Sequence, residues 1–163
     1  MSHKTQIQIP ARTSIGEGLY IGHLGRVIIH PDAKLGKNIN IATGVTIGME
    51  NRGKRKGVPE ISDNCWIGTN AVVVGNIKIG RDVLIAPLTY VNFDVPDHSI
   101  VIGNPAKIIS RENATKDFIN KCLRVPQNGW KTTNAWLGYE EYYAIHCIGG
   151  ENIAEFTMEN VNI

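Results

Sequence analysis

Long apolar runs, paired cysteines and a strong charge of one sign are all missing from this 163-residue chain. No apolar run approaches the roughly 20 residues of a membrane-spanning helix, which argues against a membrane span. The opening MSHKTQIQIP lacks the basic and then apolar layout of a signal peptide, so we expect a cytoplasmic protein. A formal net charge of only +2 argues against a nucleic-acid binder that depends on bulk charge.

The three cysteines are also uninformative about function. Cys65, Cys122 and Cys147 are odd in number, far apart and in no C-x-x-C arrangement. This spacing argues against a disulfide framework and a zinc site, so we expect buried thiols and no bound metal. The chain length suits one globular unit.

Isoleucine and valine are abundant, at 23 and 12 residues against 7 leucines, and such β-branched side chains predict mostly strand. Aliphatic residues also recur every six positions, in two registers. The ten lead residues are Ile29, Leu35, Ile41, Ile47, Ile61, Ile67, Val73, Ile79, Ile85 and Val91. A period of six fits neither a helix nor simple strand alternation. Short strands ending at corners, with three hexads to a triangular coil, predict a β-solenoid.

The tandem hexads IGTNAVVVGNIKIGRDVLIAP and the following VPDHSIVIGNPAKII resemble the hexapeptide-repeat acyltransferases. The resemblance is strongest to their serine acetyltransferase-like branch, which includes bacterial polysaccharide O-acetyltransferases. It implies a left-handed parallel β-helix over residues 7–111. We expect residues 112–163 to form a C-terminal extension, with a short helix at 112–124 and an aromatic-rich tail. That tail would cap the solenoid, pack at a subunit interface or line an acceptor pocket.

Two interruptions of the repeat are the places where a flat coil could gain reactive groups. The first separates Ile21 from Ile29 by eight positions rather than six, and His23 stands within it. The second is GMENRGKRKGVPE at 48–60, which reads as a projecting loop. This loop is either a solvated excursion or an arm whose four cations attract the phosphates of a cofactor or an anionic acceptor.

His23 is the predicted catalytic residue. It is flanked by glycines in IGHLG, it coincides with the register slip, and it matches the histidine of the family's Asp-His-Ala-Thr-Gly type segment. A neutral imidazole can take the proton of a hydroxyl that attacks a thioester and pass it to the leaving thiolate. His30 is a weaker candidate for a supporting role, and His3, His98 and His146 are expected to be structural or solvated. The chain also lacks the histidine triplet with which a γ-type carbonic anhydrase holds zinc on this fold.

The resemblance implies acetyl-CoA as the donor, bound in a groove between two parallel solenoids. The matching positions are Thr69, Ala86, Pro87, Asn92, Phe93, Lys107 and Arg111, with Lys107 facing the phosphates. Such a groove requires more than one chain, and three around an axis is the usual closed arrangement, so we expect a homotrimer with shared active sites.

Several positions depart from the serine enzymes. Their Asp-Ile-His is Gln8-Ile9-Pro10 here, their second active-site histidine corresponds to about Val58, and their second phosphate-site cation falls on Ser110. Because the acidic partner of the histidine is missing, serine is an unexpected acceptor.

We therefore expect an acetyl-CoA-dependent O-acetyltransferase that acts on a hydroxyl of a sugar or polysaccharide precursor. The alternatives are N-acetylation of an amino-sugar nucleotide, serine O-acetylation, and a solenoid that serves only as a structural or partner-binding trimer.

Overall fold

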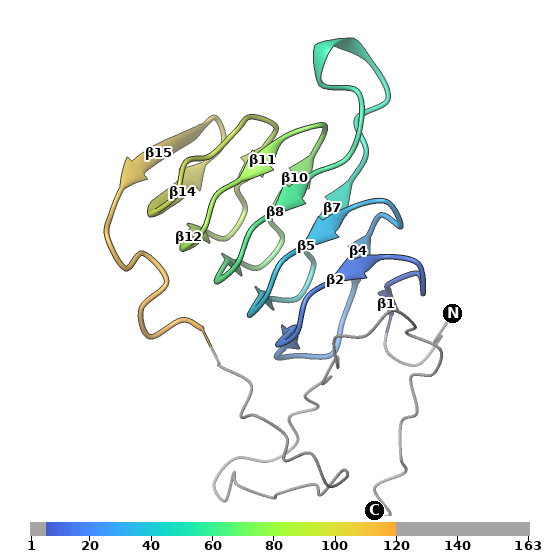
Figure 1. The fold of residues 1–163 in the computed structure, drawn as a ribbon, viewed down its shortest axis with the longest axis horizontal. Helices are drawn as coiled ribbons and strands as arrows, with labels where there is room; N and C mark the ends of the chain where they lie inside the picture. The colour runs from blue at the N-terminus through green and yellow to red at the C-terminus, as the bar shows by residue number, and fades with distance from the viewer. Residues whose placement is uncertain (1–5, 120–163) are drawn as a thin grey trace, which may run out of the picture.

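The computed structural model describes residues 6–119, and these residues wind into a β-solenoid (Figure 1). Three parallel sheets form its walls, and each coil of the chain adds one strand to each sheet in turn. The first sheet contains β1 (Ile7–Gln8), β4 (Val27–Ile29), β7 (Thr46–Gly48), β10 (Val72–Val74) and β13 (Tyr90–Val91). The second sheet contains β2 (Ser14–Ile15), β5 (Lys34–Leu35), β8 (Glu60–Ile61) and β11 (Lys78–Ile79).

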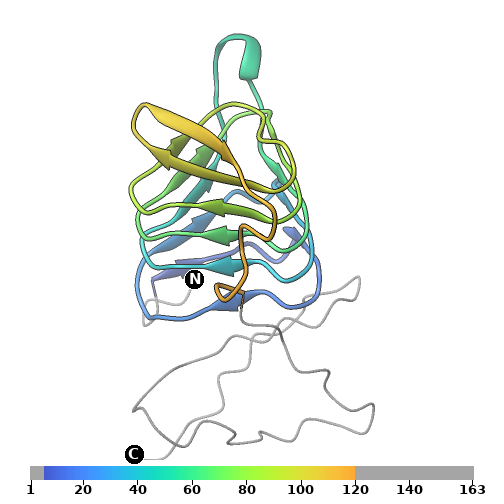
Figure 2. The same cartoon turned by 90° about the vertical axis from the view of Figure 1, so that its left-hand side faces the viewer.

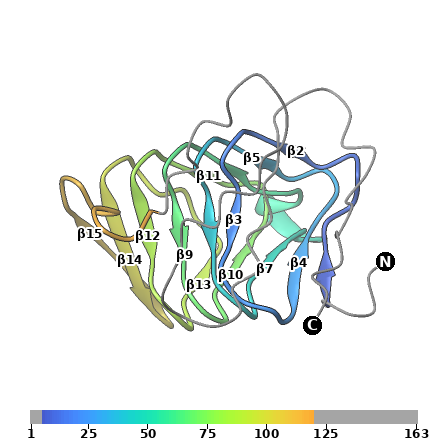
Figure 3. The same cartoon turned by 90° about the horizontal axis from the view of Figure 1, so that it is seen from below.

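The third sheet closes the triangle and carries an antiparallel strand at its C-terminal end. It contains β3 (Tyr20–Ile21), β6 (Asn40–Ile41), β9 (Trp66–Ile67), β12 (Val83–Ile85), β14 (Ser99–Gly103) and β15 (Ala106–Ser110). Strands β15, β14, β12, β9 and β3 follow one another from left to right in Figure 3. The predicted all-β solenoid is therefore confirmed.

The hexad repeat sets the register of the sheets. Lead residues pair with lead residues, so that Ile41 lies between Ile21 and Ile67, while Leu35 pairs with Ile61. Residues four places after a lead residue also face inward, and Ile39, Val45 and Ile77 are at most 1% exposed. The interior is consequently a single column of mainly β-branched side chains. This column explains why the sequence repeats every six residues.

The corners between the sheets form three edges that run along the solenoid. We call them edge 1/2 (9–13, 30–33, 49–59, 75–77 and 92–94), edge 2/3 (16–19, 36–39, 62–65, 80–82 and 96–98) and edge 3/1 (22–26, 42–45, 68–71 and 86–89). The loop at 49–59 leaves edge 1/2, contains the 3-10 helix Gly53–Arg55, and projects from the solenoid as predicted (Figure 1).

Residues 112–119 do not form the helix expected over 112–124. They form turns in which Lys116 N donates to Asn113 O and Phe118 N donates to Thr115 O. Asn113 and Asp117 have positive φ angles of 55° and 69°, which a right-handed helix cannot contain. In Figure 2 this segment, coloured orange, runs from β15 back across the coils. The remainder of the predicted helix and the aromatic tail lie outside the described residues.

Candidate functional site

The register slip predicted at His23 lies in the first corner of edge 3/1. Six residues separate Ile21 from Ile28, whereas four residues separate their partners Ile41 and Thr46, which leaves two surplus residues in the corner. The corner contains Gly25 at φ 137°, where a Cβ atom would collide with the side chain of Thr43. Gly25 therefore approaches the neighbouring corner so closely that a side chain has no room there.

The corner exposes three side chains to solvent, those of His23, Leu24 and Arg26. His23 is exposed, and the neighbouring Leu24 is 54% exposed. A histidine at this position can present an imidazole nitrogen to a molecule that lies along edge 3/1. The sequence therefore predicts correctly both the slip and the outward direction of His23.

Two of the residues predicted to bind acetyl-CoA, Thr69 and Pro87, lie on the same edge as His23. Thr69 O accepts a hydrogen bond of 2.9 Å from Leu88 N in the next corner, and Asn70 N donates over 3.0 Å to Thr43 O in the previous one. Pro87 is exposed beside Leu88. Backbone hydrogen bonds thus join the corners into a continuous edge from Arg26 to the last coil.

Ala86 also belongs to this edge, but its side chain is not available to a ligand. It is 8% exposed and forms a small apolar cluster with Leu84 and Ala114, against which Trp66 packs. The segment 112–119 therefore lies against the outer face of the third sheet. We call this segment the strap.

Asp82 holds the strap in place. Its carboxylate accepts hydrogen bonds from Thr115 N at 2.9 Å, Thr115 Oγ1 at 2.6 Å and Ala114 N at 3.0 Å, and it lies 2.8 Å from His98 Nδ1. Burial alone would raise the pKa of Asp82, but the hydrogen bonds from Thr115 and His98 outweigh it and lower the pKa. The same contact raises the pKa of His98.

Two further contacts fix the distal end of the strap. The Phe118 ring packs edge-on against Trp66 with centroids 5.2 Å apart, and Asn40 Nδ2 donates to Phe118 O over 3.1 Å. The sequence interpretation missed the strap, because the signals are an aspartate at one corner and a threonine 33 positions later.

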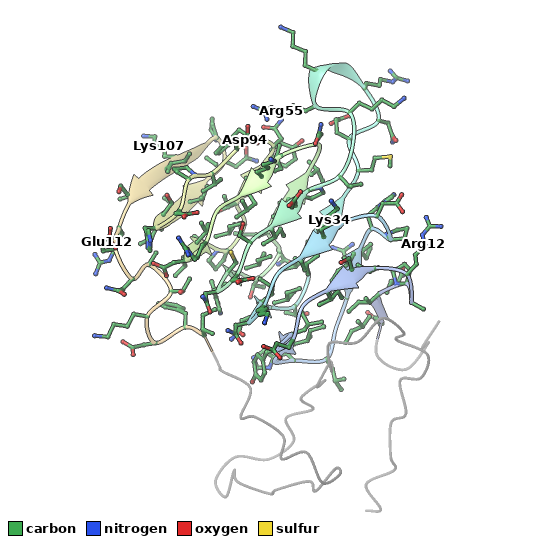
Figure 4. All side chains as sticks on the ribbon, in the orientation of Figure 1. Arg12, Lys34, Arg55, Asp94, Lys107 and Glu112 are labelled. Carbon is green, nitrogen blue, oxygen red and sulfur yellow. The ribbon has the colours of Figure 1, made fainter. Side chains whose placement is uncertain are left out.

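The other residues predicted to bind acetyl-CoA are distributed over all three edges. Asn92 and Phe93 lie on edge 1/2, across the first sheet from His23, and Phe93 packs against the core. Arg111 is at edge 2/3, where its N donates to His98 O over 2.7 Å. Lys107 is exposed on β15 close to the Gly103–Ala106 turn, which lies at the C-terminal end of edge 3/1 (Figure 4). A single chain thus places His23, Thr69, Pro87 and Lys107 on successive levels of one edge.

The projecting loop lies on edge 1/2 as well. Arg55 Nη1 is 3.8 Å from Asp94 Oδ1 at the base of the loop, a contact that can be followed in Figure 4. Arg52, Lys54 and Lys56 are exposed. Val58, at the position of the family's second histidine, is half-buried near the end of the same loop.

The remaining described histidines have local structural partners. His30 Nδ1 accepts a hydrogen bond of 3.1 Å from Asp32 N, and His98 contacts Asp82 and lies 3.6 Å from Glu112 Oε2. His3 and His146 lie outside the described residues. Within residues 6–119, no three metal-ligating side chains cluster, and no helix is long and apolar enough to cross a bilayer.

Comparison with known proteins finds a hexapeptide-repeat family and several serine acetyltransferases. Residues 59–92 match the family model described as "Bacterial transferase hexapeptide (six repeats)". A serine acetyltransferase of Staphylococcus aureus is 37% identical over 124 residues, which is 75% of this chain and 58% of that relative. This chain therefore spans less than two thirds of that relative's length.

Solved structures of serine acetyltransferases share the fold. The Neisseria gonorrhoeae enzyme in complex with serine is 38% identical, with a TM-score of 0.54 over 61% of this chain and 40% of that one. The Brucella abortus enzyme in complex with coenzyme A is 32% identical, with a TM-score of 0.55 over 61% and 40% of the two chains. The solenoid of these enzymes is a left-handed β-helix, and the fold described above is of the same kind.

Proposed function

We propose that this chain, whose hexads match those of bacterial hexapeptide transferases over residues 59–92, is an acetyl-CoA-dependent O-acetyltransferase. One observation carries the proposal. The bulged corner turns His23 outward at the start of edge 3/1, along which Thr69, Pro87 and finally Lys107 are stacked. A Brucella abortus relative of the same fold is described in complex with coenzyme A, which supports this donor.

The axial spacing of the coils suits an extended donor. Corners of successive coils are about 4.8 Å apart, so the corner of Pro87 lies about 14 Å along the axis from that of His23. Acetyl-CoA is a long molecule with a thioester at one end and phosphates at the other. Lying along this edge, it would bring the thioester to His23 and its phosphates toward Lys107. In a symmetric trimer with a parallel axis, corresponding coils stay at the same height, so the spacing is unchanged if a neighbouring chain supplies His23.

In the proposed reaction, neutral His23 accepts the proton of the acceptor hydroxyl as its oxygen attacks the thioester carbonyl. The tetrahedral intermediate then collapses, the C–S bond breaks, and the protonated imidazole returns its proton to the departing thiolate. The products are the acetyl ester and free CoA. General-base catalysis of this kind contributes about 10²- to 10⁴-fold.

Two acceptors are supported by different observations. Serine is supported by the relatives, which are described as serine acetyltransferases, and is the first acceptor to test. A sugar hydroxyl in polysaccharide synthesis is supported by residues 8 and 58, where the uncharged Gln8 and Val58 replace the acidic and histidine side chains expected of a serine enzyme. Gln8 is exposed on β1, next to the strand that follows the His23 corner.

The test is thiol release from acetyl-CoA with serine, a panel of sugars and an amino-sugar nucleotide as acceptors. We expect a hydroxyl acceptor to be turned over and His23→Ala to lower kcat at least 100-fold. Turnover of the amino sugar alone would indicate N-acetylation. If no acceptor releases thiol and no CoA derivative raises the Tm, the solenoid has a structural or partner-binding role. Mass measurement in solution tests the trimer.

A further inference from the structure

Each regular corner of edge 3/1 contains one residue in the left-handed backbone region. These residues are Gly44 at φ 78°, Asn70 at φ 57° and Leu88 at φ 60°. Glycine and asparagine tolerate this conformation, whereas a leucine is strained there because its Cβ approaches the backbone carbonyl oxygen. Leu88 is thus the residue type least suited to its position among the three.

The packing of Leu88 within its own chain does not offset this strain. Its side chain is 70% exposed, the largest value among the exposed large hydrophobic residues of the described chain. Its backbone N–H donates to Thr69 O over 2.9 Å, a hydrogen bond that asparagine or glycine would make equally well. A strained, exposed apolar side chain that the fold does not need is a signal of function.

The surroundings of Leu88 indicate which part of a ligand it meets. The corner 86–89 reads Ala-Pro-Leu-Thr and carries no charged side chain to attract a phosphate. It also lies about 14 Å along the axis from the corner of His23, where the reacting acyl group must be. Lys107 lies beyond it on β15. Between the thioester and the phosphates, acetyl-CoA presents the pantetheine arm, which carries a geminal dimethyl group.

We propose that Leu88 determines donor affinity by packing its side chain against the apolar part of the pantetheine arm. The inference rests on the proposed function, because it needs acetyl-CoA on edge 3/1. Burying this exposed side chain on the donor repays the backbone strain only in the complex.

Leu88→Asn is the test, because asparagine already occupies the equivalent position in the previous corner. Removing the strain should raise the Tm by about 2–4 °C in a domain of this size. Losing the apolar contact should raise the KM for acetyl-CoA about five- to tenfold and leave kcat at saturating donor within about twofold. Acetyl-pantetheine should show the same rise in KM, since it retains the arm and lacks the nucleotide.

Ile109→Asn is the matched control. Ile109 is 51% exposed but lies in an ordinary strand, away from edge 3/1, so this variant should neither change the KM nor raise the Tm. An unchanged KM in Leu88→Asn would overturn the inference while leaving the proposed function intact. A lower Tm together with a smaller solution mass would also overturn it, because Leu88 would then pack against a second copy. If the wild-type chain does not bind CoA by calorimetry, the proposed function itself fails.

Discussion

Edge 2/3 and edge 3/1 flank the same sheet, yet they differ in what joins their corners. On edge 2/3, Asn38 Nδ2 donates to Asn64 Oδ1 over 3.0 Å, Asp63 Oδ1 accepts from Lys37 N over 2.7 Å and Asp97 Oδ1 accepts from Arg81 N over 2.7 Å. The backbone bonds that cross edge 3/1 are accompanied by exposed apolar side chains and the His23 bulge. The polar side chains of edge 2/3 therefore help to hold successive coils together, whereas edge 3/1 exposes His23, Leu24 and Leu88.

The largest expected effect is a difference in kcat between variants of two histidines, one on each edge. His23→Asn should lower kcat at least 100-fold with little change in Tm, because the general base is lost from an exposed corner. His98→Asn should leave kcat within about twofold, since the His98 imidazole contacts the Asp82 and Glu112 side chains at the other edge of the sheet. Steady-state kinetics and thermal melts of both variants check the prediction. Equal losses of kcat would show that the edges do not divide their roles in this way.

The next effect concerns the aspartate that holds the strap. Asp82→Ala removes the acceptor of three hydrogen bonds from residues 114 and 115, so we expect a loss of about 2–4 kcal/mol in the free energy of unfolding. Asp82→Asn keeps one acceptor oxygen and tolerates the φ of 56° at this position, so it should lose about half as much. Urea titration monitored by circular dichroism measures both. A neutral result for Asp82→Ala would mean that the strap contributes nothing to stability.

A smaller contrast comes from one glycine on each edge. A Cβ atom at Gly36, on edge 2/3, would meet the backbone of Ser62 and Asp63 at 2.9 Å, so Gly36→Ala should cost about 1–3 kcal/mol. The three atoms nearest to a Cβ atom at Gly22, on edge 3/1, all belong to the Tyr20 side chain, the first at 2.9 Å, and that ring can rotate away. Gly22→Ala should therefore cost less than about 1 kcal/mol. A larger loss at Gly22 would show that the Tyr20 ring cannot move away.

The sequence predicts the solenoid well because its signal is local and repeated. Lead residues such as Ile41 and Ile67 stand in register because every coil buries the same positions. The same regularity makes an exception visible, and for this reason the slip at His23 can be located in the sequence by counting residues between lead positions.

The rest of the site depends on contacts between distant segments or on backbone conformation. The burial of Ala86 in one cluster with Ala114 does not follow from the repeat. The position of Asn92, by contrast, is one hexad after Ala86 and therefore on the next edge, and counting hexads would have found it. The left-handed conformation of Leu88 follows only by comparison with Gly44 and Asn70, after the corners have been aligned.

The smallest expected effect is a pH dependence of stability that originates on edge 2/3. The hydrogen bond to Asp82 raises the pKa of His98, and Glu112 and Asp97 add to the effect. The contribution of protonated His98 to stability is therefore complete below about pH 6.5 and is lost as the pH rises through the folded pKa. The pKa of Asp82 is lowered. The contribution of the Asp82 carboxylate to stability is therefore complete above about pH 4 and is lost as the pH falls through the folded pKa. The Tm should therefore be highest between about pH 4 and 6.5. His98→Asn should flatten the decline on the alkaline side and keep the one on the acid side, whereas an unaltered alkaline decline would assign it to other groups.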